Sequence, residues 1–559
     1  MRATRAGAAS AGGSALVSRV GSSSPNSRVG YRVRRRCSSL KCSRHARSSR
    51  LAGRAPRSGI LATIFRRGTL LVGLAVTALT GMGCGGAAAR HAERLPGRTR
   101  PLYEHNWAHP RDLRFPDNRF TPPDPSATLV TTSSGLRAYV VPAPSEHIVQ
   151  IVAAVPLGRS VEQANEIGAA EMISRLISQQ ITQRLGPTFM GRVQTDQDVD
   201  LTRISLQVMA EDWQPALAAV VGALRQPRLD AAAIEGNRTG GGAGGGGRGG
   251  RGGGGQSGAA RPVAELTRML ASYPLAPLEP DVAVQREAVR TLAARMLGPA
   301  AVAIGIGGGV TRENAQRALE SLTAGWPAPA ATIADATSGF SAAPNARENR
   351  SRLIDEPGYT TWIAVGHPIP KIAPADEAAV AVMTDVVNIR LNITVREIRG
   401  LANQAVLVVP ATTRRDGLLY VRTGARPESV APLIRYSLQE LSRIREAGGA
   451  PTSEELEQVK GGVVLGKWQG SLDGARNVSA TYAVEAARYG SLDRLMRWPE
   501  AVRAVTSKDV TEAAARYIHP DQMGVVVIGQ IDAVRKARHP RWPASLDEVL
   551  PSPRRSSNP

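Results

Sequence analysis

Cysteine is scarce in this chain of 559 residues and is confined to its first part. The three cysteines are Cys37, Cys42 and Cys84, so residues 85–559 contain none. A disulfide framework and a cysteine-ligated metal site are therefore both excluded beyond Cys84. Hydrophobic residues make up 42% of the chain, which is enough to build ordinary cores.

Acidic residues are absent from residues 1–84, which hold 16 of the 70 Lys and Arg residues and none of the 47 Asp and Glu residues. The formal net charge of +23 therefore falls to +7 for the remainder, which does not imply a nucleic-acid partner. A Gly-rich insertion at 239–256 carries Arg248 and Arg251, as RGG-type RNA-binding segments do. It lacks aromatic residues, which favours a low-complexity insertion instead.

An export signal is predicted at the end of the basic leader. Arg66 and Arg67 precede the apolar or small residues 68–83, a run shorter than the roughly 20 residues that span a bilayer and typical of a secretory signal. The run ends in LTGMGC at Cys84, which resembles a bacterial lipoprotein box without its usual leucine three places before the cysteine. We expect lipidation of Cys84 and a location in the periplasm or at the outer membrane. Ordinary cleavage after Ala89 is the alternative.

The remainder divides by composition and by an internal repeat. Residues 293–299 (AARMLGP) lead into an apolar strand at 301–305, and residues 514–520 (AARYIHP) lead into another at 525–529, an offset of 221 residues. This period is too long for a solenoid and predicts two homologous halves. The predicted segments are a leader (1–84), a Pro-rich tether (85–126), an N-terminal half (127–326), a linker (327–346), a C-terminal half (347–540) and a disordered tail (541–559).

A helix is predicted to follow the buried strand at 147–155. Five apolar residues recur at helical spacing, and polar residues occupy the opposite face; the apolar set is Ala169, Met172, Ile173, Leu176 and Ile181. On the polar face Glu171 and Arg175 are i,i+4 partners, so we expect an exposed ion pair worth about 0.3–0.5 kcal/mol.

This segment resembles the active-site region of the insulinase and mitochondrial processing peptidase family. GRSVE at 158–162 resembles the family's G-x-R-x-E, and GAAEMISR at 168–175 resembles its G-x-A-H-x-x-E-H helix. Weaker motifs follow in the family's order at 396–403, 451–460 and 505–510. The resemblance implies an α+β fold of two homologous halves, each a mostly antiparallel sheet covered by helices.

The resemblance also implies a zinc site that this chain lacks. The family's two histidine ligands and glutamate base fall on Glu171, Arg175 and Ser174 respectively. Arginine does not deprotonate in proteins and so cannot ligate a cation. The third ligand would fall within 239–256, which contains no acidic residue. We therefore predict no catalytic residue and no bound zinc.

The later motif REIRGLAN, which resembles the family's R-E-x-x-G-L-A-Y, implies peptide contacts from Arg396, Arg399 and Asn403. Asn403 stands where the family usually has tyrosine, and a structural or surface role for the two arginines remains an alternative. A separate GIGGG run at 305–309 imitates a dinucleotide-binding loop but has no acidic residue at the required distance. We interpret it as a strand-to-helix turn.

These observations predict an exported, non-catalytic member of the family that binds peptides or assembles with an active peptidase subunit or with a second copy of itself. A zinc metalloendopeptidase with an atypical or partner-supplied metal site is one alternative. A purely structural envelope lipoprotein is the other.

Overall fold

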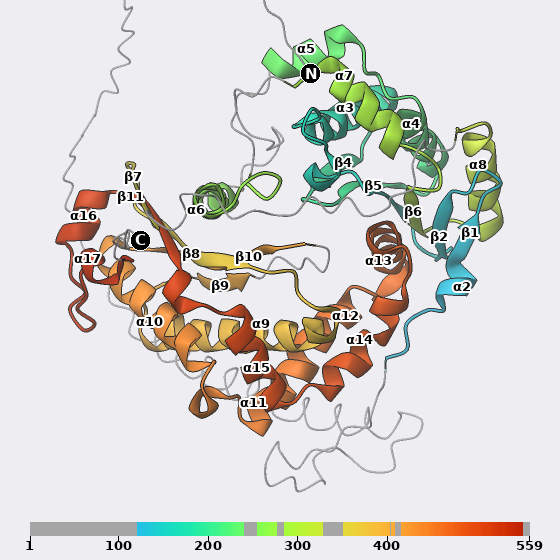
Figure 1. Ribbon diagram of the computed structural model, residues 1–559. Coiled ribbons are helices and arrows are strands. Elements are labelled where there is room, and N and C mark those ends of the chain that lie inside the picture. The colour runs from blue at the N-terminus through green and yellow to red at the C-terminus, as the bar shows by residue number, and fades with distance from the viewer. Residues whose placement is uncertain are drawn as a thin grey trace, which may run out of the picture. The chain divides into compact units, whose positions relative to one another are not determined.

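Two β-sheets with helices on their faces organise the chain (Figure 1). The computed structural model describes residues 120–239, 254–276, 284–327, 350–402, 404–408 and 415–551, all within one unit that extends from Asp117 to Pro559. The first sheet contains β1 (Leu129–Thr131), β2 (Arg137–Pro142), β3 (Ile148–Val155), β4 (Arg192–Gln197), β5 (Thr202–Met209) and β6 (Ala303–Gly308). The second contains β7 (Ser351–Asp355), β8 (Thr361–Ile369), β9 (Gln404–Val408), β10 (Gly417–Ala425) and β11 (Gly524–Gly529). The α+β class predicted from the sequence is confirmed.

The two sheets share one strand order, apart from an additional strand, β1, at the edge of the first. The first sheet runs β1-β2-β6-β3-β5-β4 and the second runs β7-β11-β8-β10-β9. The strands β2, β6, β3, β5 and β4 therefore correspond, in that order, to the five strands of the second sheet. In each sheet one pair is parallel, β2 with β6 and β7 with β11, and the other pairs are antiparallel. The strands β1 and β2 form an antiparallel hairpin with Leu129 opposite Tyr139. The strand β4 was not predicted from the sequence.

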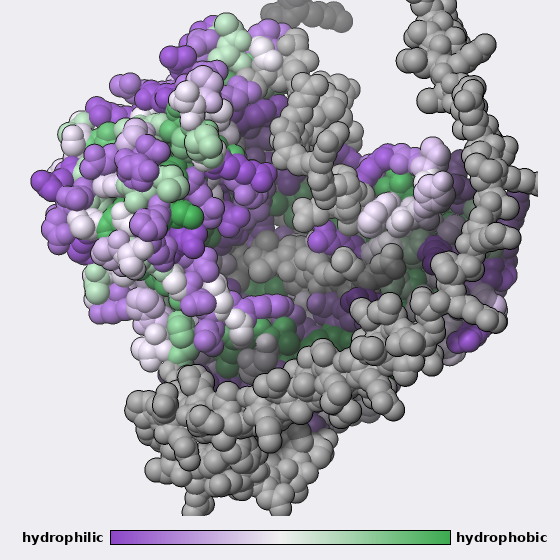
Figure 2. All heavy atoms as spheres, turned by 180° about the vertical axis from the view of Figure 1, so that it is seen from behind, coloured by the Kyte–Doolittle hydropathy of each residue, from purple (hydrophilic) through white to green (hydrophobic). Residues whose placement is uncertain are grey.

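Amphipathic helices cover one face of each sheet. The helices before the second sheet are α2 (Pro125–Thr128), α3 (Ala169–Leu185), α4 (Trp213–Arg225), α5 (Ala231–Thr239), α6 (Gly254–Leu270), α7 (Arg286–Met296) and α8 (Arg312–Thr323). Of these, α3, α4, α7 and α8 share a core with the first sheet. Their outward surfaces are mainly hydrophilic in Figure 2, as expected for helices that bury a single apolar stripe.

The second core lies between the other sheet and a second set of helices. That set comprises α9 (Glu377–Leu391), α10 (Val430–Arg443), α11 (Ser453–Gln458), α14 (Asp493–Ala504), α15 (Ser507–Tyr517), α16 (Ile531–Lys536) and α17 (Leu546–Val549). Two further helices of this region, α12 (Gly466–Gly470) and α13 (Gly474–Tyr489), contribute no residue to this core. Within the described residues, one helical stretch, Pro374–Ile398, is long and apolar enough to cross a membrane by length and composition. Its most apolar window is 56% buried in the protein and α9 belongs to the second core, so it is a core helix here.

Each sheet also buries its opposite face, and the helix that covers this face comes from the other part of the chain (Figure 1). The helix α6, which precedes β6 in the sequence, packs on β8, β10 and β11 of the second sheet. The helix α13, which precedes β11, packs on β2, β3 and β6 of the first. With a crossing helix on one face and the other helices on the opposite face, each sheet is covered on both sides. This explains why β6 and β11 are buried along their whole length.

Glycine allows α13 to approach the first sheet closely. A Cβ on Gly305 would lie 2.2 Å from the Ser479 carbonyl oxygen, and one on Gly307 would lie 2.3 Å from that of Ala475. The interpretation of 305–309 as a strand-to-helix turn is therefore wrong for its first four residues. These residues belong to β6, and the glycines accommodate a helix backbone.

Both ends of the folded region differ from the prediction. The tether was predicted to extend to residue 126, but Phe120 packs edge-on against Trp468 with ring centroids 5.6 Å apart. The tail was predicted to be disordered from 541, but Trp542 and α17 pack against the second core and Leu546 is fully buried. Apolar residues within short polar stretches gave too weak a periodic signal to reveal this packing.

Candidate functional site

The start of α3, where the catalytic helix of an active relative would begin, is held by the GRSVE segment. The Glu162 carboxylate accepts hydrogen bonds from the backbone N–H groups of Gly168 (2.9 Å) and Ala170 (2.7 Å). It thereby satisfies donors that a helix start leaves without partners, and its charge complements the positive end of the helix dipole. Arg159 extends away and donates to the carbonyl oxygen of Ala276 at 2.9 Å. Glu162 therefore orients the helix, and Arg159 ties the same segment to the residues that follow α6.

Tyr273 completes this cluster, and sequence reasoning missed it. Its hydroxyl donates to the Glu162 carboxylate from 111 residues further along the chain, just after the crossing helix α6. Burial raises the pKa of Glu162, and burial together with the hydrogen bond to Glu162 raises the pKa of the Tyr273 phenol beyond its usual range. A protonated phenol on a partly buried carboxylate is a positioning contact. No local motif marks Tyr273, because only the crossing of α6 brings it to α3.

The three zinc-site positions lie on α3 as predicted, and their chemistry does not suit a cation. Arg175 Nη2 lies 2.9 Å from Glu171 Oε1, and the two side chains are 38% and 53% exposed. Ser174 is buried beside them at 5% exposure and offers a neutral hydroxyl. A permanent positive charge thus occupies one ligand position and engages the one carboxylate available.

No other metal site was found in the part of the chain that the structure describes. Within it, no group of three or more His, Cys, Asp or Glu side chains is placed to hold a metal ion. The tract predicted to replace the third zinc ligand falls mostly on 240–253, and Cys84 with its leader precedes residue 120; both lie outside the described residues. Absence of zinc and lipidation of Cys84 stay predictions.

The second motif sits at the end of α9, where the helix passes into a π-helical segment, η5 (Asn392–Ile398). The Arg399 guanidinium stacks over the ring of Tyr436 at 4.0 Å from its centroid and lies 5.1 Å from that of Trp542. Its Nη1 donates to the Thr394 carbonyl oxygen at 2.9 Å. Arg396 lies exposed beside Glu397, 3.4 Å away. Asn403 lies outside the described residues. Peptide binding by the three residues stays a prediction.

We expect the two arginines to differ sharply in their effect on stability. Arg399→Ala removes a cation that contacts two aromatic rings and should lower the free energy of unfolding by about 2 kcal/mol. Arg396→Ala removes an exposed pair and should stay within about 0.5 kcal/mol of the wild type. Urea unfolding of the two variants measures this, and equal losses would show that the stacking over Tyr436 contributes nothing.

Comparison with known proteins gives a family match that begins downstream of α3. Residues 283–463 match the family described as the peptidase M16 inactive domain. No curated protein sequence is detectably similar to this chain. A solved peptidase M16 inactive domain from Pseudomonas fluorescens superposes with a TM-score of 0.55 at 17% identity, covering 74% of this chain and 98% of that one.

Two further solved structures are similar. A chain of Complex III2 from Candida albicans has a TM-score of 0.55 at 12% identity, covering 73% of this chain and 96% of that one. The first half of the periplasmic protease PqqL from Escherichia coli has a TM-score of 0.54 at 13% identity, covering 74% of this chain and 95% of that one. At such low identities these likenesses establish the fold and leave the activity open.

Proposed function

We propose that this chain is a non-catalytic member of the M16 (insulinase) peptidase family that binds peptides or assembles with an active peptidase. The match of residues 283–463 to the peptidase M16 inactive domain supports the membership. The observation that carries the proposal is the state of α3. The helix keeps its position, its Glu162 cap and its buried face, while the ligand positions carry the Glu171–Arg175 ion pair.

The scaffold around α3 supports a binding role. Both sheets have helices on both faces, and their matched strand order supports two homologous halves built on one plan. A chain that retained the fold for no purpose would accumulate destabilising substitutions, because most substitutions lower stability. A fully packed fold around a site that does not suit zinc therefore indicates that selection has kept the binding surfaces of the protein and not a catalytic site.

Support for a partner and for a location comes from the similar structures and from the leader. One similar structure is a chain of a multisubunit complex and another is a periplasmic protease. We propose that this protein is exported, anchored through lipidated Cys84 at the periplasm or outer membrane, and paired there with an active peptidase subunit or with a second copy. The signal-like segment at 68–83 and the LTGMGC sequence support export and anchoring.

Metal analysis and peptide hydrolysis test the loss of catalysis. We expect the purified protein to hold substoichiometric zinc and to cleave no peptide of a mixed library. Glu171→Gln should change neither result, because Glu171 is paired with Arg175 and holds no metal. Stoichiometric zinc with turnover that Glu171→Gln abolishes would overturn the proposal in favour of a peptidase with an atypical metal site.

Assembly is tested with an active M16 peptidase of the same genome. The two purified chains should form a complex by analytical ultracentrifugation, and peptide cleavage by the complex should depend on the partner's glutamate base alone. A chain that neither associates with a peptidase, nor self-associates, nor binds peptide would instead be a structural envelope protein.

A further inference from the structure

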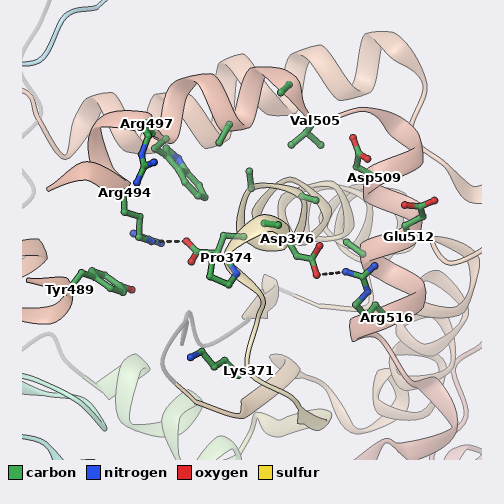
Figure 3. A pocket seen from close by; sticks show the side chains of 18 of the residues that line it. Lys371, Pro374, Asp376, Tyr489, Arg494, Arg497, Val505, Asp509, Glu512 and Arg516 are labelled. Carbon is green, nitrogen blue, oxygen red and sulfur yellow. Dashed lines mark hydrogen bonds and ion pairs between the residues drawn. The ribbon is translucent and has the colours of Figure 1, made fainter. Parts of the chain in front are cut away.

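A cavity of about 870 Å³ opens in the helical layer of the second sheet, away from α3 and from the segment at 396–399. It is bounded by the start of α9, by α14 and by α15 (Figure 3). Small apolar side chains form much of its wall: Pro374, Ala375, Ala378, Ala379, Ala501, Ala504, Val505 and Ala513. Its volume lies within the roughly 300–1,000 Å³ of ligand pockets.

One end of the cavity is aromatic and cationic. Figure 3 shows Tyr489, Arg494 and Arg497 together there, with Asp509 and Glu512 at the opposite end. Arg494 is locked in place: its Cζ lies 4.7 Å from the Tyr489 ring centroid and its Nε lies 2.6 Å from a Glu377 carboxylate oxygen. Arg494 is therefore held in place before any ligand arrives.

Two cations of the lining have no acidic partner among the described residues. Arg497 is held only through its Nε, 3.3 Å from the carbonyl oxygen of Asp493 on its own helix, which leaves both Nη groups to donate elsewhere. The Lys371 side chain is exposed at the same cavity, and only its backbone N–H is bonded, to Asp416. Both ammonium and guanidinium donors are thus available to a ligand.

The carboxylates of the lining are already engaged. Asp376 pairs with Arg516, and Glu377 pairs with Arg494. Glu512 lies 3.5 Å from Lys508. Asp509 caps α15 by accepting from the Thr506 N–H (2.8 Å) and hydroxyl (2.7 Å), and these hydrogen bonds lower the pKa of Asp509. The groups left to recognise a ligand are therefore the two cations.

The balance of charge limits what the ligand can be. Five cationic and four acidic side chains line the cavity, so its lining carries one excess positive charge, which a monoanion neutralises and a phosphate dianion exceeds. We propose that this cavity binds a monocarboxylate carried on a small apolar body, with Arg497 contacting the carboxylate and the alanine-rich wall contacting the body. The C-terminus of a peptide and a short fatty acid share this chemistry. The proposal is independent of pairing with a peptidase.

Fluorescence anisotropy of the full chain with a labelled Leu-Ala-Leu-Ala-Leu peptide tests the proposal. The peptide with a free C-terminus should bind, and its C-terminal amide should bind about 10-fold or more weakly, because a charge-assisted hydrogen bond is lost. Arg497→Gln should weaken binding of the free acid by a similar factor. Arg503→Gln is the matched control: Arg503 is exposed on the same helix, does not line the cavity, and should leave binding unchanged.

Competition separates the two sources of the carboxylate. Displacement of the peptide by butyrate at comparable concentration, with the same loss in Arg497→Gln, assigns the cavity to small carboxylates, and displacement only by free-acid peptides assigns it to peptide C-termini. Equal binding of acid and amide, equal binding to Arg497→Gln, better displacement by inorganic phosphate, or no binding of either carboxylate would each overturn the proposal. Because Arg497 is exposed, an unchanged thermal midpoint for Arg497→Gln excludes misfolding as the cause.

Discussion

Gly305→Ala should lower the free energy of unfolding by about 3 kcal/mol, at the upper end of what overpacking in a core costs. The new methyl group would lie 2.2 Å from the Ser479 carbonyl oxygen and 2.6 Å from its carbonyl carbon, so α13 would have to move off the first sheet. Trimming the Ser479 side chain cannot relieve the clash, because the contact is with the backbone. Urea unfolding followed by circular dichroism measures the loss.

A matched glycine provides the control. Gly470 at the end of α12 has a helical backbone, and a Cβ added to it would meet no atom within 4 Å, so Gly470→Ala should be neutral or raise stability by up to about 1 kcal/mol. If Gly305→Ala unfolded at the wild-type urea concentration, the close approach of α13 to β6 would be wrong.

Stability should fall by about 3 kcal/mol between pH 6.5 and pH 4 through His367 alone. This histidine is fully buried on β8. Its Nδ1–H donates to the Pro368 carbonyl oxygen (2.7 Å), and its Nε2 accepts from the His519 N–H (3.1 Å). Both ring nitrogens of the neutral imidazole are therefore hydrogen-bonded. Burial lowers the pKa of His367 from 6.5 to about 4, an effect that His519 and Arg445 increase and that Pro368 and Asp521 oppose.

The sign follows from proton binding by the two states. Above pH 6.5 His367 is neutral whether the chain is folded or unfolded and has no effect. Below pH 6.5 the unfolded chain takes up a proton that the folded chain refuses until about pH 4, so acid favours unfolding across that window. Urea unfolding of the wild type and of His367→Asn at several pH values measures it.

His367→Asn should be less stable than the wild type at neutral pH. Between pH 6.5 and 4.5 the slope of its unfolding free energy against pH should be smaller than that of the wild type by close to one bound proton. The exposed His147→Asn is the control and should keep the wild-type slope. Carboxylates add their own acid sensitivity, which the comparison of slopes cancels. Equal slopes for all three proteins would show that His367 is protonated in the folded state.

The candidate site shows where sequence reasoning succeeded. Spacing along α3 was enough to predict that Glu171 and Arg175 form an exposed pair, because a helix fixes which residues share a face. The same local logic gave the strands β3, β6 and β11, whose apolar runs are continuous. Tyr273 and the Arg399 stack escaped, because their partners lie far away in the sequence and follow no periodic pattern.

The sequence by itself determined the α+β class, the repeated order of helix and strand, and the loss of zinc-binding side chains from α3. These features depend on residue types and on periodicity within single helices and strands. Only the tertiary structure decided that α6 and α13 each cover the other sheet, and that Gly305 and Gly307 make room for a helix. An apolar strand sequence indicates that both faces of the strand are buried. It does not indicate which segment covers each face, because the hydrophobic effect is non-directional. The carboxylate-binding cavity has the same origin: its cations and its wall come from helices that meet only when the chain folds.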